Sequence, residues 1–468
     1  MKRKILYSSL IVAFISCIGF IVLHYRHKEK KMEAMVYTLL PRKGLLAKTD
    51  EWLVTQKNVA TLQQKIKLNA ADTKSTIALA NYFILEARAT GNYPYYDMAA
   101  MKLVNNVLKS DAANFEALTL KSIIYLSQHH FADGLATAQQ AGSIIPYNAF
   151  VQGILVDGHV EMGNYDSALD CAKKMMDIRP DLRSYARASY LREIFGDYTG
   201  AIDAMKLAIE AGAPGDETTE WSRVQLGHLY ENTGDLKAAE MNYQQALANR
   251  PGYMYALAGM ARIATAEKEY NKAIEYYQQA AKDATSNSFM QELANVYYLA
   301  GKKEKGAELT KSLIDELKRN ATAANSNENI GHYADKELAY AYLSAGNTEK
   351  ALEHALMEYN RRPKNIEANE TVAWMYFENN EPVKALPYLQ EALKTNSKNP
   401  TLLCRAGLIF AKNGDAVKAK KYLQDGLQNN PNIDESLKVA VSQQLKNQNI
   451  VFAKYPFYQP LVSYDLPA

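Results

Sequence analysis

Histidine is the residue type in this chain best suited to chemistry, because it serves both as a metal ligand and as a general acid or base near neutral pH. The chain has 8 histidines, and His129-His130 is the one adjacent pair. The surrounding pattern predicts a solvated turn between two helices, and adjacent side chains on such a turn seldom converge on one ion. The pair therefore predicts no metal site.

Motifs of the common catalytic types do not occur in the sequence. It has no Gly-rich phosphate loop, no Gly-x-Ser-x-Gly, no His-Glu-x-x-His and no Cys-x-x-Cys. Scattered Asp and Glu fit the charged faces of surface helices. An enzyme would need a catalytic group inside a concave surface, around His228, Asp157 or His159. We expect no enzyme activity and no cofactor.

Small residues recur along the chain at intervals that are mostly 33 or 34 residues, with longer steps of 38 and 45. They are Ala100, Gly134, Ala168, Ala201, Ala239, Ala273, Gly306, Ala351, Ala385 and Ala419. A period of this length built from helical segments indicates a solenoid, in which each unit buries its apolar face by stacking on its neighbours. The repeat takes up nearly the whole chain, so no segment is long enough for a catalytic domain.

One unit shows why each repeat is expected to form two helices. Apolar or small residues return every three or four positions on both sides of the break at Gly234. Gly227 and Ala239 are small where the paired helices should cross, and Tyr243 fills the volume beside them. Pro251 ends the second helix.

Pairs of apolar and small residues such as Leu226-Gly227 recur once per unit, and three residues later an aromatic residue such as Tyr230 often follows. With these pairs the chain resembles the tetratricopeptide-repeat (TPR) family over residues 73–432. The resemblance implies an all-α fold, a right-handed α-solenoid of about ten helix pairs. Polar residues stand at three positions where the family has apolar or small ones, so their units are expected to pack irregularly: Lys121, Arg192 and Glu358.

Segments outside the regular repeat are expected to cap or interrupt the stack. Residues 32–72 contain a predicted capping helix from Asp50 to Leu68, and residues 433–468 contain a second one from Asp434 to Asn447. The aromatic tail that follows this second helix is expected either to fold back on the last repeat or to dock a partner. Insertions are predicted at residues 91–98, 211–219 and 319–333, of which the last is Asn-rich and the expected flexible joint.

The first 31 residues have the pattern of a membrane anchor. An apolar run of 19 residues from Ile5 to Leu23 has basic residues on both sides and is long enough to span a bilayer core. Since no small-x-small site ends the run, we predict an uncleaved single-pass helix in the inner membrane, with lipidation of Cys17 as the alternative. The short basic N-terminus favours repeats on the periplasmic side, although the flanking charges are nearly balanced and the cytoplasmic side is the alternative.

Charge and cysteine content exclude two classes of protein. With 54 Lys and Arg against 51 Asp and Glu, the net charge of +3 is too even for a nucleic-acid-binding surface. We expect no nucleic-acid partner. The repeats contain two of the 3 cysteines, Cys171 and Cys404, which are far apart and make no disulfide framework.

The concave surface of such a stack is the candidate functional site, because in this family the first helix of each unit lines it. Eight residues are predicted to form a partner-binding groove: Tyr190, Trp221, His228, Tyr255, Arg262, Tyr298, Tyr340 and Trp374. Aromatic residues beside Arg are typical of binding hot spots. The alternative for each is that it packs between neighbouring units.

These features predict a membrane-tethered TPR scaffold or adaptor that binds a protein or peptide partner in its groove without catalysis. Tethering would raise the local concentration of the bound partner against other components of the same membrane. Fold alone does not select the partner. Two alternatives stay open: a self-assembling structural component of an envelope complex, and an enzyme with its site hidden in the groove.

Overall fold

The computed structural model describes residues 14–20, 23, 36–283, 289–326 and 331–447. These residues form helices and no strand. Most of the predicted anchor and the whole aromatic tail from residue 448 lie outside the described residues. Nowhere in the described part does a helix combine the length and the apolar character needed to cross a bilayer.

The helices of the described residues follow the predicted repeat as consecutive pairs, and each helix packs mainly against its partner and the next pair. A short 3-10 helix, η1 (Leu46–Lys48), and α2 (Asp50–Leu68) precede them. The pairs are α3 (Thr73–Thr90) with α4 (Tyr93–Ser110), α5 (Phe115–Ser127) with α6 (Phe131–Ile144), α7 (Ala149–Glu161) with α8 (Tyr165–Ile178), α9 (Leu182–Ile194) with α10 (Tyr198–Glu210), α11 (Glu217–Asn232) with α12 (Leu236–Asn249), α13 (Met254–Ala266) with α14 (Tyr270–Asp283), α15 (Met290–Leu299) with α16 (Lys303–Ser326), α17 (Asp335–Ser344) with α18 (Thr348–Arg361), α19 (Ile366–Glu378) with α20 (Pro382–Ala392), and α21 (Pro400–Lys412) with α22 (Ala416–Asn429). The last helix is α23 (Glu435–Asn447).

Tight packing inside a unit explains its small residues. Tyr243 of α12 is 0% exposed and lies between two glycines. A Cβ atom added at Gly227 would be 2.3 Å from the ring, and one at Gly259 would be 2.6 Å from it. Only glycine leaves room for the ring at both positions, because close-packed interiors do not absorb an extra methyl group freely.

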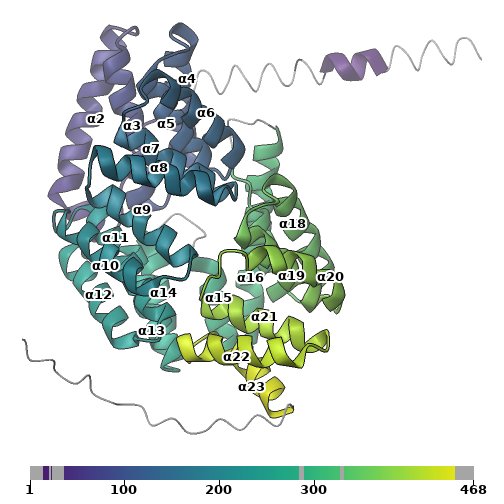
Figure 1. The fold of residues 1–468 in the computed structure, drawn as a ribbon. Coiled ribbons are helices and arrows are strands. Elements are labelled where there is room, and N and C mark those ends of the chain that lie inside the picture. The colour runs from purple at the N-terminus through teal and green to yellow at the C-terminus, as the bar shows by residue number, and fades with distance from the viewer. Residues whose placement is uncertain (1–13, 21–22, 24–35, 284–288, 327–330, 448–468) are drawn as a thin grey trace, which may run out of the picture.

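The helix pairs wind around a central space, so that units far apart in sequence meet (Figure 1). Hydrogen bonds join residues 199 to 205 positions apart, close to six periods of the repeat. We call the best-buried of these contacts the central seam: Glu161, Gly163 and Tyr165 at the α7–α8 turn meet Arg362, Lys364, Asn365 and Ile366 at the start of α19.

The central seam is closed by backbone as well as by side chains. The amide of Asn365 donates to the carbonyl oxygens of Val160 and Glu161, at 3.2 and 3.1 Å. The Tyr165 hydroxyl accepts from the backbone N–H of Ile366 at 3.0 Å. Gly163 has φ +73, and a Cβ atom there would lie 2.2 Å from the Lys364 carbonyl oxygen. Glycine therefore meets two demands here, the left-handed turn and the close backbone approach.

Several expectations need correction in detail. The insertion predicted over residues 319–333 begins as helix, since α16 runs to Ser326, and residues 331–334 pack against the α5–α6 turn rather than forming a free joint. The three units with polar departures still form regular pairs. In the eighth unit the departure has a partner, because Glu358 is buried and forms ion pairs with Arg361 and Arg362.

Candidate functional site

The inner surface of the winding contains a pocket of about 910 Å³ that is partly open to solvent, which we call the chamber. Three groups of helices line it: α3 to α5 from the N-terminal units, α11 and α13 from the middle, and α15 to α17 with the segment before α17. The volume lies in the range of pockets that hold small organic ligands, about 300–1,000 Å³. Contacts between distant units thus bring three separate parts of the chain together around the chamber.

Aromatic side chains form one side of the chamber, which we call the aromatic wall: Tyr93, Trp221 and Tyr255. The rings of Trp221 and Tyr255 meet edge to face with centroids 4.9 Å apart, and the hydroxyl oxygens of Tyr93 and Tyr255 are 3.3 Å apart. Burial raises the pKa of both tyrosines, so both phenols are protonated at neutral pH. The wall therefore offers apolar faces together with hydrogen-bonding hydroxyl groups.

Ionisable groups around the chamber are predominantly acidic. Among the described lining residues, five carry a carboxyl group and two a cationic one: Asp97, Glu217, Glu292, Glu316 and Glu337 against Arg88 and Lys336. Arg88 and Glu217 form an ion pair of 2.9 Å beside the aromatic wall. Burial raises the pKa of Asp97 to about 7, although the Ser127 hydroxyl donates to this carboxylate at 2.7 Å. The lining is accordingly suited to a neutral or basic ligand.

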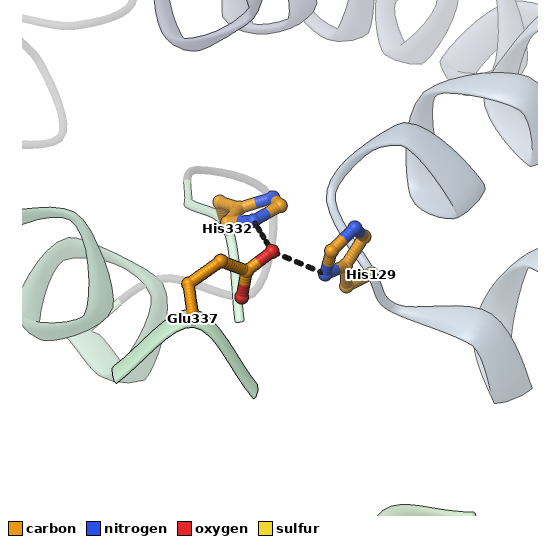
Figure 2. A group of neighbouring side chains, drawn as sticks. All are labelled: His129, His332 and Glu337. Carbon is orange, nitrogen blue, oxygen red and sulfur yellow. Dashed lines mark ion pairs between the residues drawn. The ribbon is translucent and has the colours of Figure 1, made fainter. Parts of the chain in front are cut away.

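At another part of the chamber wall, His129, His332 and Glu337 converge (Figure 2). The Glu337 Oε1 atom lies 3.7 Å from His332 Nε2 and 3.9 Å from His129 Nδ1. Burial alone would lower the pKa of His332, but the Glu337 carboxylate and the Ser127 backbone raise it. Burial lowers the pKa of His129 well below its usual value. The cluster thus contains one carboxylate and two imidazole rings of unlike basicity.

The expectation of a solvated histidine turn is wrong. His130 is 2% exposed, and its ring stacks on Tyr333 with centroids 4.0 Å apart. His130 Nε2 donates to the Gly331 carbonyl at 3.1 Å. The physical reason is the segment before α17, which comes from about 200 residues later in the chain and covers the turn. Sequence spacing carries no information on that contact.

Three of the eight predicted groove residues line the chamber: Trp221, Tyr255 and Tyr340. Tyr340 stands on α17, where its hydroxyl accepts a hydrogen bond of 3.0 Å from Arg405. The structure therefore brings Trp221 and Tyr255 together in the aromatic wall, and places Tyr340 near the histidine cluster on the same helix as Glu337.

The other five predicted residues have different surroundings. Arg262 bonds Glu231 at 3.0 Å and donates to His228 Nε2 at 3.0 Å, in a network between α11 and α13. Tyr298 lies against Gly306 of its own unit. Trp374 is 8% exposed, between Phe377 and the Arg405 guanidinium, while Tyr190 is 43% exposed. A role of these residues in partner binding stays a prediction.

Sequence reasoning missed the chamber residues supplied by other segments, among them Arg88, Tyr93, His332 and Glu337. One signal was available for His129. In seven of the ten turns inside the helix pairs of the described residues, the left-handed residue is glycine, whereas this turn has His129 at φ +61. A side chain at a position that favours glycine costs conformational energy and invites a functional explanation.

Comparison with known proteins agrees with the helix-pair architecture. A family profile described as "Tetratricopeptide repeat" matches residues 224–288, which cover most of α11 to α14. The chain carries tetratricopeptide repeats. Its TPR units thus confirm the family resemblance noted in the sequence. No curated protein matches the sequence at a significant level.

Solved structures similar to this TPR chain include two bacterial proteins. A thermophilic TPR protein in Thermus thermophilus is 18% identical, over 45% of this chain and 99% of that chain, with a TM-score of 0.35. A tetratricopeptide repeat protein from Parabacteroides merdae is 16% identical, over 56% of this chain and 98% of that chain, with a TM-score of 0.33.

Proposed function

We propose that this protein is a non-catalytic TPR scaffold that holds a segment of a protein partner in the chamber. TPR proteins act as protein-interaction scaffolds, and the chamber has a volume that a partner segment could fill. The aromatic wall carries the proposal, because clustered Trp and Tyr side chains bury large areas at small entropic cost and retain polar tips for hydrogen bonds.

The acidic lining narrows the chemistry of the partner. Carboxyl groups outnumber cationic groups by five to two in the described lining. A segment with Lys or Arg beside an apolar residue would complement both the lining charge and the aromatic wall. Its binding should weaken as salt concentration rises, since charge pairs in a hydrated chamber are screened.

We further propose that residues 1–31 tether the scaffold to the inner membrane, with the repeats on the periplasmic side. The apolar run from Ile5 to Leu23 and its basic flanks support this proposal. A reporter enzyme fused to the C-terminus tests it, if its activity is read separately for the periplasm and the cytoplasm. Recovery of the fusion in the soluble fraction would rule the tether out.

A site-specific crosslinking experiment tests the chamber. A photo-crosslinking amino acid replaces Tyr255 in the wall, or Tyr147, which is 88% exposed and lies outside the lining, as the matched control. We expect a defined adduct in cells of the source organism from position 255 and none of the same mass from position 147. Trp221→Ala should remove the adduct in a protein with unchanged circular dichroism.

Two results would contradict the proposal. One is crosslinking of the same partner from both positions, which would mean surface contact without use of the chamber. The other is retention of the adduct in a folded Trp221→Ala, Tyr93→Ala double variant. Either result would leave the chamber without a role in binding the partner.

A further inference from the structure

Three potential metal-ligand side chains from separate segments meet in the chamber wall. His129 comes from the α5–α6 turn, His332 from the segment before α17, and Glu337 from the first turn of α17. One ligand atom from each of the three lies within 4.8 Å of the others (Figure 2). The two imidazole rings have centroids 4.0 Å apart. Two histidines and a carboxylate are the ligand set of many zinc and iron centres.

The positions of the two histidines are fixed by backbone contacts. The Tyr333 N–H donates to the Gln128 carbonyl at 3.1 Å, and His129 Nδ1 donates to the Tyr333 carbonyl at 3.1 Å. His332 also bonds the backbone of Ser127. A metal-binding histidine is usually supported by a hydrogen bond from its other ring nitrogen. At His129 the bonded atom is Nδ1 itself, so its bond to the Tyr333 carbonyl must break when Nδ1 binds an ion.

Glu337 has an oxygen atom that the protein leaves without a partner. Its Oε1 atom faces both rings, whereas Oε2 is buried and accepts no hydrogen bond from the residues that the structure describes. A buried carboxylate oxygen without a donor is costly, and such an orphan atom needs an explanation. A cation bound by both carboxylate oxygens would satisfy it, whereas a cation bound by Oε1 alone would not.

We propose that His129, His332 and Glu337 bind one divalent transition-metal ion, with Zn²⁺ as the expected occupant. Metal–ligand bonds of about 2.0–2.2 Å in a tetrahedral site place the ligand atoms about 3.3 Å apart. The separations of 3.7 and 3.9 Å from Glu337 Oε1 exceed this value by about half an ångström. All three ligand atoms lie within 4.8 Å of one another, so the side chains must move closer together to bind an ion. Ca²⁺ and Mg²⁺ fit poorly, because they prefer sites made of oxygen atoms.

Metal binding changes the tautomer of the His129 ring. Without metal, Nδ1 holds the proton that it donates to the Tyr333 carbonyl. Coordination through Nδ1 requires the neutral ring with its proton on Nε2 instead, so the Nδ1 lone pair becomes available to the ion. Protonation of either ring therefore competes with metal binding, as at other histidine sites.

Neighbouring cations are already neutralised by other carboxylates. Lys336 forms an ion pair with Glu367, and Arg362 forms ion pairs with Glu161 and Glu358. The three ligands all line the chamber, so an ion with three protein ligands keeps a coordination position for water or for a group in the chamber. The ion would also join the second unit to the segment before α17.

A zinc titration tests the proposal on the full-length, tag-free chain in detergent. The protein is stripped with EDTA and titrated with Zn²⁺ against a chromophoric chelator. We expect one Zn²⁺ per chain, with affinity at least about 100-fold weaker in His332→Ala and in Glu337→Gln. Co²⁺ should give visible d–d absorption in the wild type that both variants lose. Zn²⁺ should raise the melting temperature of the wild type alone.

His228→Ala is the matched control. His228 Nδ1 also has a glutamate near it, Glu231 at 3.5 Å, but no second histidine among the residues that the structure describes completes a site there. This variant should bind Zn²⁺ as the wild type does. Glu337→Gln keeps the size of the side chain, and circular dichroism checks that both ligand variants are folded. Absence of stoichiometric binding in the wild type, or equal affinity in all four proteins, would overturn the proposal.

Discussion

The stack of α11 to α13 and the central seam are two interfaces of this molecule that use different chemistry. In the stack, Tyr243 fills a gap between Gly227 and Gly259, so close packing of apolar surface holds the helices together. In the central seam, the Arg362 guanidinium is 2% exposed and bonds Glu161 and Glu358. At Tyr243 the stack is held mainly by close packing, with the Arg262–Glu231 ion pair beside it, whereas the central seam is held mainly by buried charge and hydrogen bonds.

The packing between neighbouring units builds the solenoid, whereas the contacts between distant units close it. A stack of apolar helix faces can extend to any length, because every unit offers its neighbour the same surface. Closure needs contacts between particular units about six periods apart in the chain. Buried ion pairs suit that task, since a displaced partner leaves an uncompensated charge and misaligned closure is penalised.

The largest effect is expected at the central seam. Arg362→Met leaves Glu161 and Glu358 without their shared cation, and removal of one partner from a buried ion pair typically costs about 3–5 kcal/mol. Denaturant unfolding should show this loss. Hydrogen exchange should accelerate over residues 160–166 and 362–368 together, because the seam opens from both sides.

Arg192→Met is the control for the seam, because Arg192 pairs with Asp197 at 2.7 Å but both side chains are about half exposed. Its loss should cost less than about 1 kcal/mol, as for other surface pairs. Equal costs for the two arginine variants would mean that burial does not distinguish the seam, and the comparison between the two interfaces would fail.

The next largest effect is expected in the stack. Gly227→Ala places a methyl group 2.3 Å from the Tyr243 ring, whose hydroxyl is held by Glu231 at 2.9 Å, so the ring cannot withdraw easily. Overpacking of this kind costs about 1–3 kcal/mol. Gly142→Ala is the matched change in a helix with ordinary contacts at 3.6 Å, and it should be neutral or stabilise by up to about 1 kcal/mol. A Gly227→Ala variant as stable as the wild type would show that the stack can accommodate the added methyl group.

The repeat in the sequence was sufficient to predict the stack. Gly227, Ala239 and Tyr243 show their roles through spacing alone, because residues three or four apart in a helix share a face. The ends of the helices could be placed for the same reason, from Gly234 and Pro251. These features are local, and each depends on residues within one or two units.

Closure and the chamber could not be predicted in the same way. The partners of Glu161, His129 and Tyr93 lie 162 to 204 residues away, and no residue pattern in the sequence shows which distant unit each one meets. The number of units per turn depends on small rotations between neighbouring pairs that accumulate along the stack. Two of the three residues of the aromatic wall, Trp221 and Tyr255, were therefore predicted, while Tyr93 came from a unit that sequence spacing does not bring near.

A smaller, pH-dependent effect is expected where α2 meets the α12–α13 turn. Burial would raise the pKa of Glu51, but hydrogen bonds and charge from Arg250 and Arg42 lower it to about 2. Because this folded-state pKa is below the unfolded value of about 4.3, Glu51 stabilises the fold above that pH and loses its contribution as pH falls toward 2.

Melting temperature measured from pH 6 to pH 2.5 checks this expectation. Glu51→Gln should lower the melting temperature at pH 6 and show a shallower decline on acidification, with one proton fewer taken up on unfolding. Glu349→Gln, on the exposed surface of α18, should follow the wild-type curve. Parallel curves for Glu51→Gln and the wild type would mean that this contact carries no buried charge, unlike the central seam.

The smallest effect is expected at the C-terminal contact between distant units. Lys268 and Glu435 are 3.0 Å apart, but the Lys268 side chain is 61% exposed, so water and salt screen the pair. The apolar face of α23 holds that helix instead, since Val441 and Leu445 are buried in the core shared with α17 to α22. Lys268→Ala should therefore leave hydrogen exchange of α23 unchanged, whereas Val441→Ala should increase it. Faster exchange in Lys268→Ala alone would mean that even an exposed ion pair contributes to closure, and that burial does not rank the contacts between turns.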